Sequence, residues 1–156
     1  MKRFYLFATL LLSLWLPAVH ADIALSASLG SFVQSDEGFD NPNLDFTAAL
    51  WYPVDQMVLA GISSGLQFIG TDQEVPLLAS LYLRLPIGRQ LLPIATADWG
   101  YLFRKEKNQF VWRIAGGGDL KLGDHSSIIA LIGSQMEIQN SLPNRYFARL
   151  GLLLEW

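Results

Sequence analysis

RLGLLLEW, residues 149–156, ends the chain on a largely apolar segment. The ends of soluble domains are usually polar and frayed unless the fold holds them in place. Here Leu or Trp fills five of the last seven positions, so we expect the segment to be a buried strand. Its residues alternate with period two, which is typical of a strand with two unlike faces. Leu152 and Leu154 fall on one face, and Arg149 and Glu155 fall on the other.

The beginning of the chain reads as a targeting segment. MKRFYLFATLLLSLWLPAVHA starts with two basic residues, continues with an apolar run and ends in small residues, which is the pattern of a secretory signal peptide. The apolar run over residues 4–16 is short for a transmembrane helix, and Pro17 interrupts it. We therefore predict a signal peptide over residues 1–21 and a mature chain over residues 22–156.

Composition excludes several classes of function. Without the first 21 residues the chain keeps nine basic and 14 acidic residues, a net charge of about −5, so nucleic acid is not an expected partner. The sequence contains no cysteine, so no disulfide stabilises the exported chain. The mature part has no apolar run of about 18 residues, which excludes a helical membrane span.

Eight segments of the mature chain alternate between bulky apolar residues and mostly small or polar ones. Seven of them have a clear register. The seventh contains SSIIALIG, which is apolar on both faces, so its register rests on Gln135 and Glu137 sharing a face with Ile129 and Leu131. The predicted strands lie within residues 23–33, 44–52, 58–68, 75–85, 95–103, 110–119, 126–137 and 146–156.

The connections between these segments alternate in character. PVDQ, PIGRQLLP and KLGDH follow the second, fourth and sixth segments, whereas the polar QSDEGFDNPN, GTDQE, RKEKNQ and IQNSLPN follow the odd ones. Pro, Gly, Asn and Asp supply the turn geometry in most of them. The pattern predicts an all-β protein, an eight-stranded antiparallel up-and-down barrel.

Alternation alone does not decide whether the bulky face points into a soluble core or outward into lipid. Small residues dominate the opposite face and suit the narrow inside of a membrane barrel. That face also carries charges of both signs, which we expect to form a lumen charge network, with Asp98 and Arg113 as its leading pair. The eight predicted members are Asp45, Arg84, Asp98, Arg113, Asp119, Glu137, Arg149 and Glu155.

Aromatic residues are placed as a membrane barrel requires. If the odd strands run outward, the aromatics of the bulky face gather near the two rims, as in the aromatic girdles of membrane barrels. A simpler interpretation is that aromatic residues favour strands. The expected interface aromatics are Phe68, Tyr101, Phe103, Phe110, Trp112 and Tyr146 at the outer rim, and Tyr52 and Trp156 at the inner rim.

Together these features resemble the small outer-membrane barrels of the OmpA and OmpX type. The resemblance rests on the signal peptide, the eight alternating strands and the final strand RYFARLGLLLEW, which ends on an aromatic residue. It implies a transmembrane barrel over residues 22–156 in the outer membrane, whose last strand pairs with its first. It also implies contact with outer-membrane lipid and lipopolysaccharide, and recognition of the final strand by the barrel-insertion machinery.

A catalytic interpretation has one candidate motif, DHSS at residues 124–127. His125 is the single histidine of the mature chain, and Ser126 and Ser127 follow it. We predict that KLGDH lies on the periplasmic side, away from the lipid A acyl chains of the outer leaflet, so we interpret His125 as a solvated turn residue. The His, Ser and Asn signature associated with lipid A deacylases is missing. With no cysteine and one histidine, we predict no metal site and no cofactor.

The outer loops are the remaining candidate surface. Acidic residues in the first two could bind Ca²⁺ or Mg²⁺ shared with lipopolysaccharide phosphates, and the basic third loop could touch those phosphates; the alternative is a set of solvated tips. The residues are Asp36, Glu37 and Asp40 in the first loop, Asp72 and Glu74 in the second, and Arg104, Lys105 and Lys107 in the third.

We therefore expect a small, non-enzymatic outer-membrane barrel with a structural or surface-interaction role and a lumen filled by side chains. A lipid A modifying enzyme of the same fold and a soluble periplasmic lipocalin-like carrier are the alternatives. Glycines are expected to relieve crowding and permit tight curvature, and Gly116 to Gly118 are also a candidate bulge.

Overall fold

The computed structural model describes residues 22–34, 43–105, 107–138 and 145–156. The predicted signal peptide and the acidic residues Asp36, Glu37 and Asp40 lie outside the described residues. No helix in the described part is long and apolar enough to cross a membrane. The strands are β1 (Ala24–Gln34), β2 (Asn43–Pro53), β3 (Val58–Ile69), β4 (Asp72–Arg84), β5 (Leu91–Phe103), β6 (Gln109–Lys121), β7 (Ser126–Glu137) and β8 (Arg145–Glu155).

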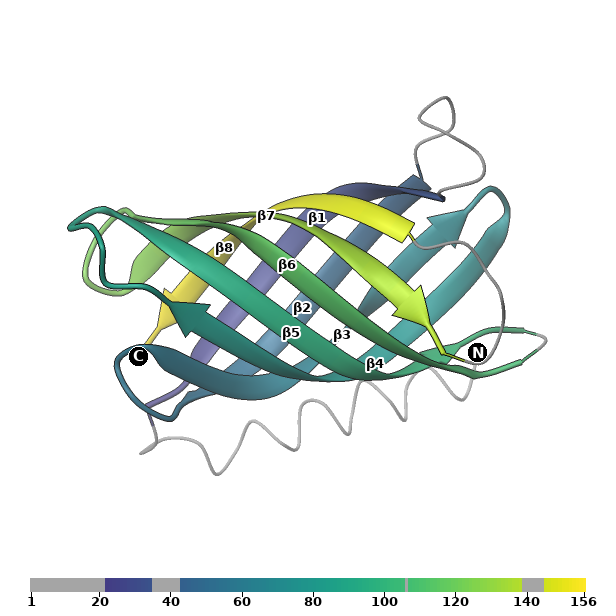
Figure 1. Cartoon of the computed structure of the whole chain (residues 1–156), viewed down its shortest axis with the longest axis horizontal. Helices are drawn as coiled ribbons and strands as arrows, with labels where there is room; N and C mark the ends of the chain where they lie inside the picture. Colours follow the sequence, from purple (N-terminus) through teal and green to yellow (C-terminus); the bar gives the residue numbers. More distant parts are fainter. Residues whose placement is uncertain (1–21, 35–42, 106, 139–144) are drawn as a thin grey trace.

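The eight strands form one closed antiparallel barrel in chain order (Figure 1). β8 pairs with β1 from Ala24 opposite Glu155 to Gln34 opposite Arg145, so the apolar final segment closes the barrel. This confirms the predicted eight-stranded up-and-down fold. We call the end with the β2–β3, β4–β5 and β6–β7 connections and Trp156 the turn end, and the opposite end the loop end.

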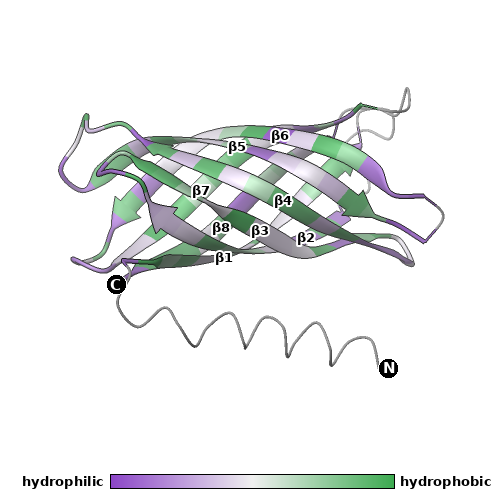
Figure 2. Cartoon of the chain, turned by 90° about the horizontal axis from the view of Figure 1, so that it is seen from below, coloured by the Kyte–Doolittle hydropathy of each residue, from purple (hydrophilic) through white to green (hydrophobic). Residues whose placement is uncertain are grey.

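The two faces of the barrel wall differ sharply in polarity. Every charged residue within the eight strands falls at an inward position of the alternation, whereas Leu, Ile and aromatic side chains fill most outward positions. Leu150, at the middle of β8, is 63% exposed on the outside. Ile129, Leu131 and Gln135 are buried inside, as predicted for the seventh strand. Figure 2 shows hydrophobic residues spread along the barrel wall and hydrophilic ones concentrated at both ends.

The β3–β4 connection is shorter than predicted. GTDQE was expected to form a loop, but β4 begins at Asp72 and leaves a turn of Gly70 and Thr71 only. Gly70 has a φ of 57°, a conformation that glycine adopts without steric penalty and that suits a tight hairpin turn. The assignment of Asp72 and Glu74 to an outer loop is therefore wrong: both lie in β4, and Glu74 is buried inside the barrel.

Two smaller expectations also change. β5 begins at Leu91 rather than near Ala95, because Leu91 already pairs with Leu120 of β6. The glycines of β6 form no bulge, since both neighbouring ladders continue without interruption through Gly116 to Gly118.

Two neighbouring glycines of β6 provide a matched test of the strand register and of how closely the strands approach. A Cβ at Gly117 would overlap the backbone carbonyl of Ala130 on β7, whereas a Cβ at Gly116 would find its nearest atom, the carbonyl oxygen of Ile94, 3.9 Å away. We expect Gly117→Ala to lower the free energy of unfolding by about 1–3 kcal/mol because the strands must move apart. Gly116→Ala should change it little. Urea titration of the refolded protein in detergent micelles measures both, and equal effects would contradict the register described here.

Candidate functional site: the charged lumen

Charged and polar side chains fill the barrel at both ends and at its middle. We call Glu74, Arg104, Glu137 and Arg145 the loop-end cluster; Asp45, Asp98, Arg113, Gln135 and Arg149 the middle layer; and Tyr82, Arg84, Asp119 and Glu155 the turn-end cluster. A group of apolar side chains, among them Trp51, Leu59 and Leu153, packs inside the same barrel.

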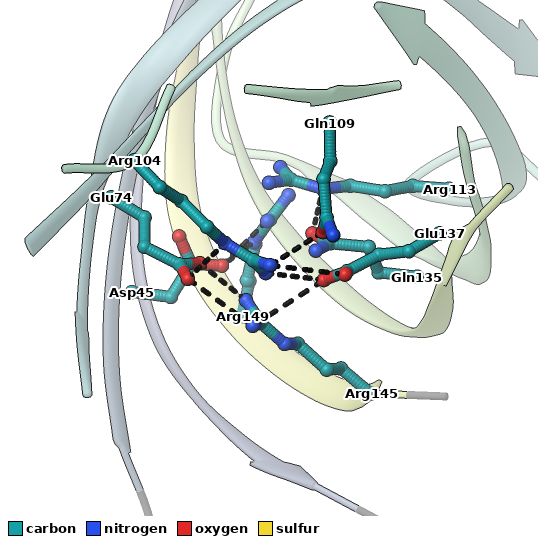
Figure 3. Close-up of polar contacts among 9 residues, drawn as sticks. All are labelled: Asp45, Glu74, Arg104, Gln109, Arg113, Gln135, Glu137, Arg145 and Arg149. Atoms are coloured by element: carbon teal, nitrogen blue, oxygen red, sulfur yellow. Dashed lines mark hydrogen bonds and ion pairs between the residues drawn. The ribbon is translucent and has the colours of Figure 1, made fainter. Parts of the chain in front are cut away.

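In the loop-end cluster each arginine binds both carboxylates (Figure 3). Arg145 Nη1 lies 2.5 Å from Glu74 Oε2, and its Nη2 lies 3.3 Å from Glu137 Oε1. Arg104 pairs with Glu74 and places Nη2 2.5 Å from Glu137 Oε1. The cluster has two charges of each sign and joins β4, β7, β8 and the β5–β6 connection across the mouth of the barrel.

The middle layer contains one direct ion pair. Arg149 donates from Nε to Asp45 Oδ2 at 2.6 Å, and Thr47 donates to the other oxygen of Asp45 at 3.3 Å. Arg113 donates from Nε to Gln135 Oε1 at 2.6 Å. These contacts tie β8 to β2 and β6 to β7 beneath the loop-end cluster.

The turn-end cluster centres on Arg84. Its Nε lies 2.9 Å from Asp119 Oδ2, and its Nη2 lies 2.5 Å from Glu155 Oε1. The hydroxyl of Tyr82 donates to the same Asp119 oxygen at 2.9 Å. The ring of Tyr82 meets Trp51 edge to face, with centroids 5.6 Å apart. β4, β6 and β8 are thus linked across the barrel at this end as well.

All eight residues expected in the lumen network lie at inward positions, but their pairing differs from the expectation. Asp98 and Arg113 face each other in the β5–β6 register, yet the structure forms no ion pair between them among the described residues. The sequence analysis assigned Glu74 and Arg104 to outer loops and did not single out Arg145. All three continue the inward alternation one residue past the predicted strand ends, so that extension was the available signal.

The expected interface aromatics all point outward. Tyr52 and Trp156 lie at the turn end and the other six lie toward the loop end, where Tyr101 meets Phe110 edge to face at 5.5 Å. The sequence reasoning omitted Trp99, which is exposed on the outer wall and opposite Trp112.

The candidate catalytic motif lies at the turn end. His125 is exposed in the β6–β7 connection, and its backbone carbonyl accepts a hydrogen bond from the N–H of Glu155 at 3.0 Å. Within the described ranges, no hydrogen bond joins its ring to Ser126 or Ser127. No group of three or more His, Cys, Asp or Glu side chains in that part of the chain is arranged to hold a metal ion.

Comparison with known proteins gives similarity of fold alone. No protein-family model and no curated protein matches the sequence. The N-terminal barrel domain of Pseudomonas aeruginosa OprF superimposes with a TM-score of 0.63 at 10% identity, over 85% of this chain and 97% of that one. Neisserial surface protein A gives 0.63 at 6% identity, over 86% and 96%. The outer-membrane enzyme PagL gives 0.56 at 11% identity, over 84% and 98%. The chain therefore has the fold of the small eight-stranded outer-membrane β-barrels.

Proposed function

We propose that the chain is a non-enzymatic outer-membrane barrel with a structural or surface-interaction role and a lumen closed by its own side chains. One observation carries the proposal: the charges within the eight strands follow the inward alternation, with Asp72 and Lys121 exposed at strand ends, and the outer wall is mostly apolar. A soluble barrel has the opposite polarity, because its outward face must be solvated. The signal peptide over residues 1–21 remains a prediction that belongs to this proposal.

The closed lumen is supported by the ion pairs at both ends. Barrels of eight strands have interiors just wide enough to be filled by side chains or to hold one small ligand. The loop-end cluster crosses one mouth and the turn-end cluster crosses the other. These contacts favour a structural network over an open path for ions. Apolar residues inside the barrel, among them Trp51, Leu59 and Leu153, pack against one another, which favours a filled interior over the ligand chamber of a lipocalin-like carrier.

The two alternatives find less support. PagL shows that this fold can carry an enzyme, but the exposed His125 lies at the turn end, which we place on the periplasmic side.

Lipopolysaccharide and the barrel-insertion machinery are the proposed partners, the latter through the final strand. Lys105 and Lys107 are exposed at the loop end, where lipopolysaccharide phosphates would lie, whereas Arg104 turns inward.

Lipid A mass spectrometry separates the enzymatic alternative from the proposal. Cells with and without the full chain should give the same acyl pattern, because His125, the one histidine among the described residues, lies at the turn end, away from the outer leaflet in the proposed topology. A lost or added acyl chain that depends on the protein would overturn the non-enzymatic assignment.

The medium outside the barrel is tested by Leu150→Arg, with Ile87→Arg as its control. Leu150 is outward at mid-strand, and Ile87, 76% exposed, lies in the β4–β5 connection. An arginine at the bilayer midplane costs about 2–4 kcal/mol and much less near the interface. We expect Leu150→Arg to reduce folding stability in lipid vesicles by that amount, and Ile87→Arg to have little effect. A folded, soluble Leu150→Arg protein would contradict membrane placement.

The structural role of the lumen is tested by Glu74→Gln, with Asp72→Asn as its control two residues away. Glu74 is buried between Arg104 and Arg145, whereas Asp72 is exposed. Removing one partner from a buried ion pair typically costs about 3–5 kcal/mol because it leaves charge uncompensated. We expect a loss of that order for Glu74→Gln in urea titration and little change for Asp72→Asn.

A stable single-channel current from the unmodified protein in a planar bilayer would contradict the closed lumen.

A further inference from the structure

The middle layer contains hydrogen-bonding groups that no protein atom satisfies. Arg113 is 1% exposed; its Nε bonds Gln135, but both Nη atoms lack a partner among the described residues. Gln135, also 1% exposed, uses its oxygen for Arg113 and leaves Nε2 unpaired. Buried polar groups in native proteins are almost always hydrogen-bonded to protein or to ordered water.

A carboxylate and an unpaired amide oxygen also point into the lumen from other strands. Asp98 lies opposite Arg113 in the register and forms no ion pair with it among the described side chains. Gln67, on the far wall beside Asp45, leaves its Oε1 unpaired although the residue is buried. The unsatisfied donors of Arg113 and Gln135 and the unsatisfied acceptor of Gln67 thus lie inside the same barrel.

Space is present at this level. Asp98 points inward from the middle of β5, yet 7% of its surface remains accessible to a water-sized probe. Ser28 and Thr47, which also point inward at mid-strand, each retain 8%.

We propose that the middle layer is a buried hydration site, in which ordered water molecules join Arg113 and Gln135 to Asp98 and Gln67. Buried waters typically make about three hydrogen bonds to polar groups that lack other partners. Water fits because it both donates and accepts, as this mixed set requires. The site rests on the proposed closed lumen, because the loop-end and turn-end clusters separate it from the solvent at both mouths.

A bound anion fits the layer less well. Arg113 and Arg149 are balanced by Asp45 and Asp98, so the layer has no net positive charge for a halide to neutralise. An anion held by Arg113 would also lie near the carboxylate of Asp98, which faces the same strand position.

The test is NMR of the refolded protein in detergent micelles. We expect a nuclear Overhauser cross-peak between water and the side-chain amide of Gln135, with the sign that long-lived bound water gives. The backbone amides of Leu102 and Val111, which are fully buried in the strand ladders, should give none. Exchange of chloride for bromide should leave the Gln135 and Arg113 resonances unshifted.

A double variant, Arg113→Met with Asp98→Asn, removes both charges together, so that neither is left uncompensated. We expect it to fold and to weaken the Gln135 water cross-peak at least threefold. Absence of the cross-peak in the unmodified protein, or resonances that shift with the halide, would overturn the hydration site. The same sample tests the proposed function separately: a heat-dependent gel mobility shift would show a folded membrane barrel whatever the water signal.

Discussion

Closure of β8 onto β1 is the constraint on which the rest of the structure depends. In hydrocarbon no water is present to satisfy backbone N–H and C=O groups, so a membrane-spanning sheet must have no free edge. The pairs from Ala24 opposite Glu155 to Gln34 opposite Arg145 remove both edges at once. The final strand, β8, therefore has to meet two requirements. The side chains of that strand must suit lipid on the outside while its backbone completes the ladder.

Closure also fixes where polarity can be placed. With lipid outside, the charges of the strands follow the inward alternation: most lie in the lumen, and Asp72 and Lys121 lie exposed at strand ends. The cations at the three levels of the lumen are all arginine, whereas the described lysines, Lys105, Lys107 and Lys121, are exposed at the rims. The guanidinium group presents several N–H donors in a fixed plane and so can bind two carboxylates at once. Arg104, Arg145 and Arg84 all do so, and each links strands that are not neighbours in the sheet.

The sequence was sufficient to predict the strands, their two faces and the barrel, because period-two alternation is a local property and eight such segments leave few other arrangements. The sequence predicted the residues at which strands begin and end less well. The tight turn at Gly70 and Thr71 moves Glu74 from a predicted loop into the lumen. Arg104 and Arg145 lie one residue beyond the predicted strand ends, so Arg104 was assigned to an outer loop and Arg145 was not singled out.

The partners of the lumen charges were the hardest feature to predict. Asp98 and Arg113 are cross-strand neighbours, as expected, but Arg113 turns to Gln135 and Asp45 pairs with Arg149. Such choices depend on the register of several strands at once and on the direction of long side chains across the barrel. No pattern within one segment carries that information.

The central claim is that hydrocarbon contacts the bulky face of each strand, and site-directed spin labelling tests it most directly. The chain has no native cysteine, so a nitroxide attached to Leu150→Cys reports one position on the outer wall. In lipid vesicles the account predicts frequent collisions with oxygen, which concentrates in the bilayer, and few with a water-soluble nickel complex. The reverse preference at this position, in a protein shown to be folded, would contradict it.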